Sequence, residues 1–325
     1  MVRPQPLLPL LLLLFAACSS SPDEITREPA PEQEQREREL RAAEERRRDL
    51  QGVLVRLDQA IDSYVRVLSN QGEPRADQQS EQLAKSIRDM VLDQGPVEMG
   101  KEAARGKNYT NLQATAADGS NPHHQGIALA ALGFSEQHDM MPVILQGAQL
   151  TDPFVVDHAV LGLAILRAPH TPPGVLAAIV RREGHPEDGR VQAAWALYRI
   201  QGVSEKPEEI VAIWRQLLTE SRSTLPVGVI VSSVRGLGLA RDLADADLVA
   251  SFLTHPTPRV RMACAVALAR MNAQDKAPAL IELIGPRETV QNVRLHARKA
   301  LADLAGGKDY GYDQAAWRKV FDRGQ

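Results

Sequence analysis

This chain contains few cysteines and has no net positive charge. The 325 residues include two cysteines, Cys18 and Cys264, which are too few for a disulfide framework. Lysine and arginine together number 38 against 41 aspartates and glutamates, so the formal net charge is −3. Such a chain has no basic field to attract nucleic acid. No sustained segment alternates apolar and polar residues, so we expect no β-strands.

The motifs that mark common catalytic and metal sites are also missing. The 8 histidines form no His-x-x-x-His or His-Glu pair, and the cysteines form no Cys-x-x-Cys. No Gly-x-Ser-x-Gly, P-loop or dinucleotide-binding motif stands in a strand–turn–helix context. Gly236 and Gly238 lie within an expected helix, where close packing explains them. The sequence therefore predicts no catalytic, cofactor-binding or metal-binding residues.

One pattern recurs along most of the chain. Its six copies begin at His124, Val155, Gly189, Val229, Val260 and Val293. Small residues stand four and seven positions after each start, and eight positions after it stands a leucine: Leu132, Leu163, Leu197, Leu237, Leu268 and Leu301. These leucines are 31, 34, 40, 31 and 33 residues apart, a period that is typical of stacked repeat arrays.

Each repeat is expected to be a pair of antiparallel helices. Positions 0, 4, 7, 8 and 11 of the pattern share one face of a helix, with small residues where a neighbouring backbone comes close. A second apolar segment with helical spacing precedes several copies, most clearly Ile210, Trp214 and Leu218. Prolines stand near the expected helix starts, where a missing N–H costs little. The pattern predicts an all-α solenoid of about six helical repeats over residues 108–305.

Two of the copies resemble HEAT repeats closely. They are the runs His255–Ala269 and Val290–Ala302, each with a Val-Arg pair, and Glu187–Ile200 is similar. The resemblance implies a right-handed α-solenoid whose second helices line a concave surface. Residues 306–325 resemble the segment that closes bacterial HEAT arrays, and we expect a capping helix there.

Several conspicuous side chains have structural interpretations in such an array. Arg190, Arg261 and Arg294 share the position after the repeat start, and we expect them to pair with acidic groups between neighbouring repeats. Trp195 and Trp214 are expected to pack between helices rather than form a ligand cage.

The amino-terminal residues predict export and lipid attachment. Arg3 precedes the apolar run Leu7–Ala17, which is short for a bilayer span, and residues 1–17 are typical of a signal peptide. Leu14–Cys18 resembles the lipobox of bacterial lipoproteins, in which Cys18 becomes the acylated first residue; the alternative is an ordinary signal with a chance cysteine. Ser19 resembles outer-membrane sorting, so the periplasmic side of the outer membrane is favoured over the inner membrane. Residues 18–31 are expected to be a flexible tether.

Residues 32–94 are expected to form a helical stalk. The helix over residues 32–69 carries apolar residues four and three apart, as in a coiled-coil seam: Leu50, Leu54, Leu57, Ile61, Tyr64 and Leu68. A second helix, about 76–94, offers Leu83, Ile87 and Met90 or Val91 to that seam. We expect an antiparallel hairpin over about 50–94 and a solvated single helix before it. A parallel dimer along the same seam is the alternative.

These features favour a lipid-anchored envelope scaffold that binds a protein or peptide. Positions 3, 6 and 10 of the pattern lie on a flank of the second helices, and we name their residues the candidate face: His158, Gln192, Trp195, Arg199, Ser232, Arg235, Arg270, His296, Lys299 and Asp303. Its charges are mostly positive, which favours an acidic peptide or anionic ligand; the alternative is a solvated flank without a partner. An enzyme or enzyme accessory, as in HEAT-like lyases and hydroxylases, and a structural oligomer are the other hypotheses, with a monomer favoured.

Overall fold

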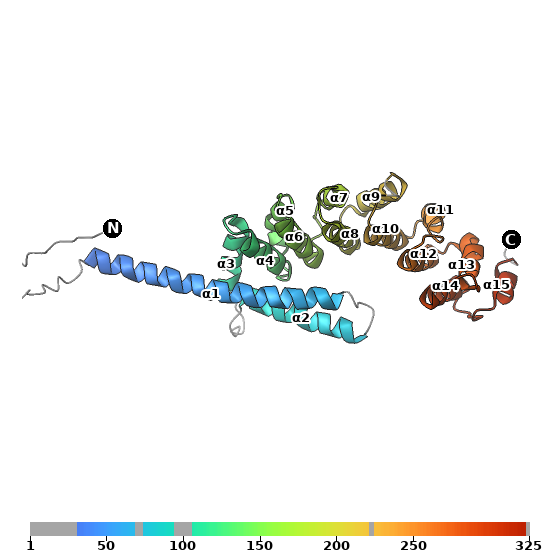
Figure 1. Ribbon diagram of the computed structural model, residues 1–325, viewed down its shortest axis with the longest axis horizontal. Helices are drawn as coiled ribbons and strands as arrows, with labels where there is room; N and C mark the ends of the chain where they lie inside the picture. The colour runs from blue at the N-terminus through green and yellow to red at the C-terminus, as the bar shows by residue number, and fades with distance from the viewer. Residues whose placement is uncertain (1–30, 69–73, 94–105, 221–223, 323–325) are drawn as a thin grey trace, which may run out of the picture. The chain divides into compact units, whose positions relative to one another are not determined.

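The computed structural model describes residues 31–68, 74–93, 106–220 and 224–322. The predicted signal peptide, Cys18 and the tether lie outside the described residues. Residues 1–48 and 49–325 form two separate units. Throughout the described ranges the regular structure is helical, which confirms the all-α prediction (Figure 1).

Helix pairs make up most of the second unit. They are α3 and α4 (Lys107–Ala117, Pro122–Gly133), α5 and α6 (Met141–Ala148, Pro153–Leu166), α7 and α8 (Pro173–Arg181, Glu187–Gln201), α9 and α10 (Pro207–Glu220, Val227–Ala240), α11 and α12 (Ala246–Ala250, Pro258–Arg270), and α13 and α14 (Ala277–Ile284, Gln291–Leu304). Each second helix contacts both its partner and the second helix of the next pair. The six predicted repeats are therefore stacked as a helical solenoid.

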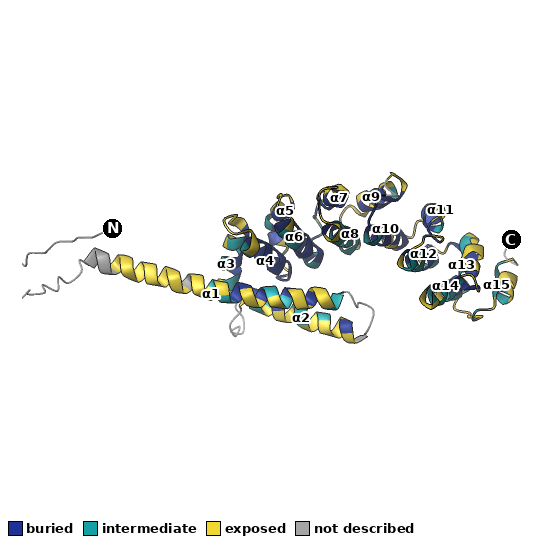
Figure 2. Cartoon of the chain, viewed as in Figure 1, coloured by how far each residue is buried: buried dark blue, intermediate teal, exposed yellow. Residues whose placement is uncertain are grey.

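The residues that define the repeat are the core of this solenoid. All six repeat leucines and all six small residues at position four are fully buried, Cys264 included. The second helices, such as α4 and α6, are accordingly buried over most of their length (Figure 2). Glycine at position seven lets backbones approach: a Cβ on Gly162 would lie 2.6 Å from the Leu129 carbonyl oxygen. The small residues thus set the distance between successive repeats.

Trp214 shows how one buried polar group links two repeats. Its indole Nε1 donates to the Gln201 side-chain oxygen at 2.9 Å, and Gln201 Nε2 donates to the Gly236 carbonyl at 2.9 Å. Trp214 is fully buried, which confirms the packing interpretation. The side-chain oxygen and nitrogen of Gln201 thus both have a partner, so hydrogen bonds offset the cost of burying the amide.

The expectation for the three equivalent arginines is correct for one of them. Arg261 forms a bidentate pair with Glu288 of the next repeat, with Nε 2.8 Å from the carboxylate. Arg190 and Arg294 instead donate to the carbonyls of Val180 and Ile284, at or near the ends of α7 and α13. Helix ends leave such carbonyls without intrahelical donors, so a nearby guanidinium satisfies them without a carboxylate.

α1 (Pro31–Leu68) and α2 (Pro74–Leu92) precede the array. In the first unit, the described side chains of α1 are exposed, including Leu40 at 65%. In the second unit, the middle of the predicted seam is buried in an antiparallel hairpin, with Leu57 and Ile87 fully inaccessible, whereas Leu50 and Leu68 at its ends are half-buried (Figure 1). Of the two alternatives on α2, Val91 is buried and Met90 half-buried.

The hairpin also packs on the array, which the sequence did not predict. The rings of Tyr64 and Phe134 meet edge to face with centroids 5.0 Å apart. Arg88 forms an ion pair with Glu136 at 2.6 Å. Hairpin and repeats share one hydrophobic core, so the stalk expected over residues 32–94 is not a separate body after residue 48.

α15 (Gln314–Phe321) follows the last pair and contacts α13. Asp313 caps its start by accepting from the Ala315 and Ala316 N–H groups, at 2.9 and 3.0 Å. Trp317 is fully buried, and its Nε1 donates to the Gly311 carbonyl at 2.9 Å. The carboxyl end of the core is thereby covered by a helix, as expected for a capping segment.

Candidate protein-binding surface

The amino-terminal part of the candidate face is occupied by contacts within the chain. His158 is half-buried, its ring stacks on Phe154 at 3.9 Å, and its Nδ1 lies 2.9 Å from the Phe154 carbonyl. Burial lowers the pKa of His158, despite the nearby Asp58 on α1. Gln192 donates to the Asp157 carbonyl at 3.0 Å. Gln192 thus links α8 to α6, while the contacts of His158 lie within α6, and both side chains present little free polar surface.

Trp195 and Arg199 lie on α8, next to the hairpin. The Arg199 guanidinium carbon is 5.6 Å from the Trp195 ring centroid, within cation–π range. Burial lowers the pKa of Arg199, and Tyr64 of α1 is close enough to affect it. Both residues are half-buried, and the Arg199 Nε donates to the Ala164 carbonyl at 3.4 Å, so this part of the candidate face presents little free polar surface.

Ser232 does not belong to an accessible surface. Its side chain sits on α10 and the residue is only 8% exposed. α10 packs between the neighbouring second helices α8 and α12, so Ser232 offers little surface to the predicted partner. Lys299 and Asp303 lie on α14 and are exposed.

Three residues of the candidate face meet around a hollow across α8, α10, α12 and α14. They are Arg235, Arg270 and His296. We call this hollow the arginine groove. Its volume is about 360 Å³, and it is lined by Tyr198, Val231, Arg235, Arg259, Met262, Ala263, Val266, Arg270, Asn292 and His296. Arg235, Arg270 and His296, which the sequence pattern assigned to the candidate face, come from three different repeats and line the same groove.

The arginine groove carries positive charge that no carboxylate neutralises. Its lining includes Arg235, Arg259 and Arg270 and no acidic residue. Desolvation lowers the pKa of Arg235; Tyr198 opposes this effect, and the charges of Arg259 and Arg270 add to it. Within the described ranges, none of these three arginines forms an ion pair.

Arginines elsewhere on the array contrast with these. Arg215 pairs with both Asp242 and Asp245 at 2.7 Å, and Arg298 pairs with Asp309. Hydrogen bonding to Asp309 raises the pKa of Arg298 above its ordinary value. In a chain with more acidic than basic residues, the unneutralised cluster in the groove is a local exception.

The candidate face did not include the other seven residues that line the groove: Tyr198, Val231, Arg259, Met262, Ala263, Val266 and Asn292. Arg259 and Asn292 occupy the same place, one residue before the start of their repeat patterns. That place lies one helical turn before position three, on the same flank. Extending the flank by one turn would have found both.

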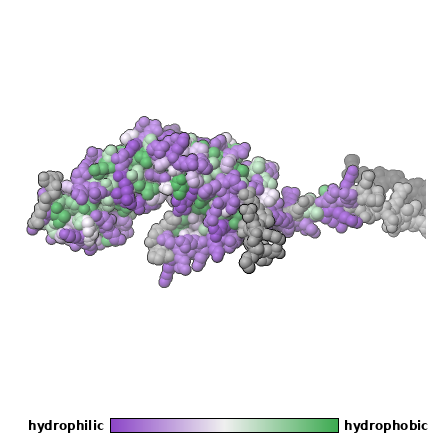
Figure 3. Space-filling model, turned by 180° about the vertical axis from the view of Figure 1, so that it is seen from behind, coloured by the Kyte–Doolittle hydropathy of each residue, from purple (hydrophilic) through white to green (hydrophobic). Residues whose placement is uncertain are grey.

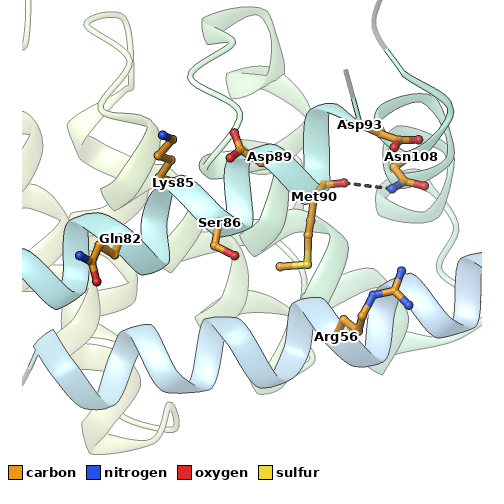
Figure 4. A pocket seen from close by; sticks show the side chains of 8 residues that line it. All are labelled: Arg56, Gln82, Lys85, Ser86, Asp89, Met90, Asp93 and Asn108. Carbon is orange, nitrogen blue, oxygen red and sulfur yellow. Dashed lines mark hydrogen bonds between the residues drawn. The ribbon is translucent and has the colours of Figure 1, made fainter. Parts of the chain in front are cut away.

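Another depression lies between α1 and α2. It measures about 540 Å³ and is lined by Arg56, Gln82, Lys85, Ser86, Asp89, Met90, Asp93 and Asn108. Figure 4 shows that Lys85 and Asp89 point away from α1, while Met90 points toward it. Asn108 donates to the Met90 carbonyl at 3.0 Å. The ionisable side chains that line this depression do not converge on one point, as those of a catalytic or ligand-binding centre would.

Two further observations concern the described part of the chain. In it, no three histidine, cysteine, aspartate or glutamate side chains are grouped so as to hold a metal ion. Among the helices described, none combines the length and the apolar character needed to cross a bilayer. Seen from behind, the surface mixes hydrophilic and hydrophobic residues (Figure 3).

Several proteins of known structure show a distant similarity to this chain. No protein-family model matches the sequence. No curated protein matches it either. An engineered protein of known structure is similar with a TM-score of 0.45 and 17% identity, over 61% of this chain and 97% of the other. Human deoxyhypusine hydroxylase is similar with a TM-score of 0.33 and 16% identity, over 78% and 98%. The complex of CpcE and CpcF of phycocyanin lyase from Nostoc sp. PCC7120 gives 0.35 and 15%, over 79% and 92%. At these identities and TM-scores, the similarities say nothing of what this chain binds or does.

Proposed function

We propose that this protein is a lipid-anchored scaffold of the bacterial cell envelope that binds another protein on its repeat array. The observation that carries the binding function is the arginine groove. It is a hollow built by four successive second helices, and its charged side chains have no ion-pair partner within the described chain. Stability gains nothing from mutually repelling arginines, so a binding role accounts for them better than packing does.

The anchor rests on the lipobox-like Leu14–Cys18. Acyl chains on Cys18 would hold the protein at the membrane, since each buried methylene contributes about 0.8 kcal/mol. Ser19 favours the periplasmic side of the outer membrane. The function proposed is binding, not catalysis.

Fractionation of cells that express the full chain tests the anchor. Wild type is expected in the membrane fraction, whereas Cys18→Ala is expected in the soluble fraction or as an unprocessed precursor. Cys264→Ala is the matched control, because that cysteine is buried in the array and should not affect anchoring. If Cys18→Ala fractionates and migrates as wild type does, the lipoprotein proposal fails.

Capture of envelope proteins tests the binding function. The full chain is used as bait, together with a variant in which the exposed residues Arg235, Arg270 and Lys299 of the candidate face are changed to glutamate. Loss of a specific captured protein with this variant supports the candidate face as the binding surface. Arg287→Glu is the control, since Arg287 is exposed in the turn before α14 and outside the groove. Unchanged capture by the triple variant would remove the face from the proposal.

A further inference from the structure

The arginine groove combines charged ends with an apolar floor. Arg259 and Arg270 lie near the two ends of α12 (Pro258–Arg270). Their separation of eleven residues corresponds to about 16 Å along the helix axis. Met262 and Val266 line the groove between them, and Val231 lines it from α10. Arg235 of α10 is close enough to both arginines to be affected by their charges.

We propose that the groove binds an extended acidic segment of a partner protein, with carboxylates at two places and an apolar side chain between them. This inference rests on the proposed function and specifies the chemistry of its ligand. Guanidinium groups bind carboxylates through paired hydrogen bonds, so the arginine at each end of α12 receives one carboxylate. The apolar side chain covers Met262 and Val266, which an inorganic anion would leave in contact with water.

The dimensions of the groove set the spacing of the ligand. Residues i, i+2 and i+4 of an extended chain point to one face, and a residue advances about 3.3 Å. Two carboxylates four positions apart are therefore separated by about 13 Å, and the flexible arginine side chains cover the difference from about 16 Å. The expected motif has Glu or Asp at both ends, an apolar residue at the middle position and any residue between.

The distribution of charge favours a peptide segment over a membrane surface or nucleic acid. Three arginines, Arg235, Arg259 and Arg270, surround one groove, while the whole chain has a net charge of −3. An extended anionic surface would meet the acidic residues as well as the groove, whereas a short segment meets the groove alone. The neighbouring Arg199 is half-buried and donates to the Ala164 carbonyl, whereas Arg235, Arg259 and Arg270 are exposed around the groove.

Fluorescence anisotropy with labelled peptides tests the proposal on the full chain. The probe has the order Glu-Ser-Leu-Ser-Glu within neutral flanks. A second peptide of the same composition, Glu-Leu-Ser-Ser-Glu, turns the leucine to the opposite face, and a third replaces both glutamates by glutamine. The first peptide is expected to bind at least tenfold more tightly than either control, and its binding should weaken as salt is added.

Variants connect that binding to the groove. Arg259→Gln and Arg270→Gln are each expected to weaken the first peptide about tenfold to a hundredfold, since each loses charge-assisted hydrogen bonds. Arg287→Gln should leave the affinity unchanged. Because each groove variant relieves repulsion between like charges, its thermal stability should equal or exceed that of wild type, so weaker binding would not reflect unfolding.

Three results would overturn the inference. One is equal binding of the glutamine peptide, another is equal binding of the reordered peptide, and the third is unchanged affinity in both groove variants. Binding of phosphatidylglycerol vesicles that competes with the probe would assign the groove to an anionic lipid instead. If the peptides fail while envelope-protein capture still depends on the candidate face, the scaffold function stands and only the acidic-segment inference falls. If the full chain captures no envelope protein, the proposed function itself fails.

Discussion

A single methyl group added at Gly133 should weaken the contact between the first two repeats. Gly133 is the last residue of α4, and its backbone lies against Gly162 of α6. A Cβ at 133 would stand 2.5 Å from the Gly162 Cα and 2.8 Å from its carbonyl carbon, where ordinary contacts begin at 3.4 Å. The distance from the added Cβ to the Gly162 Cα is thus about 0.9 Å too short, and the atoms of Gly162 belong to the backbone, which cannot move aside as a side chain can.

The expected cost follows from that geometry. Overpacking that forces backbone shifts costs typically about 1–3 kcal/mol. Alanine ordinarily gains about 0.5–1 kcal/mol over glycine inside a helix, and at the last residue of α4 this gain is small. We therefore expect Gly133→Ala to destabilise the protein by about 1–3 kcal/mol.

Gly52→Ala is the matched control with the opposite sign. Gly52 lies inside α1, and a Cβ there would meet its nearest atom, a nitrogen of Arg56, at 3.8 Å. The same change should stabilise the protein by about 0.5–1 kcal/mol, because it removes only the flexibility of glycine.

Urea unfolding combined with amide hydrogen exchange checks both variants. Repeat arrays need not unfold in one step, so exchange should show where protection is lost. Gly133→Ala should lose protection first in α4 and α6, while α12 and α14 change less. If Gly133→Ala leaves stability unchanged or raises it as Gly52→Ala does, the backbone contact between α4 and α6 is not as described.

Further outcomes follow from other contacts. Leu268→Ala empties a fully buried site and should cost about 2–5 kcal/mol, with protection lost first around α12 and α14 in hydrogen exchange; uniform loss across all repeats would contradict nearest-neighbour coupling. Burial raises the pKa of Glu288, but hydrogen bonds from Arg261 and the Val290 N–H outweigh it and hold the pKa below its usual value. The stabilisation by Glu288 is thus present above the unfolded pKa of about 4.3 and is lost as pH falls through the lower folded pKa. Glu288→Gln should cost about 1.5–3 kcal/mol at neutral pH and progressively less below about pH 4, as measured by urea unfolding; a pH-independent difference would rule out this linkage. Sedimentation should show a monomer at all concentrations, because the α1 seam is buried within one chain; a dimer that dissociates on Leu57→Asp would restore the coiled-coil alternative.

The repeat register could be predicted from the sequence because it depends on local spacing. Leu132 and Leu301 are far apart in the chain, yet each fills the same place between helices, so one pattern identifies both. The hairpin seam was predictable for the same reason. The docking of that hairpin on the array was not, because the contact of Tyr64 with Phe134 leaves no periodic signal.

The candidate site shows the same division between local and long-range information. Arg235, Arg270 and His296 were identified by their positions on a helix flank, and they do line one groove. Ser232 shares that flank but is buried, because the exposure of a side chain depends on the neighbouring helices as well as on its place in its own helix. Arg261 binds a carboxylate, whereas Arg190, at the equivalent position, binds a backbone carbonyl. The difference depends on which acceptor atoms lie near each guanidinium in the folded chain, and the repeat pattern does not contain that information.

Both ends of the stacked core are closed within one chain. α15 covers the last pair with Trp317, and α2 packs on α3, where Asn108 donates to the Met90 carbonyl. An uncovered end of a solenoid exposes the apolar face that the next repeat would cover, and a second molecule could bind there. Closure at both ends leaves neither apolar face open to a second molecule, so we expect the array not to grow into filaments as the protein concentration rises.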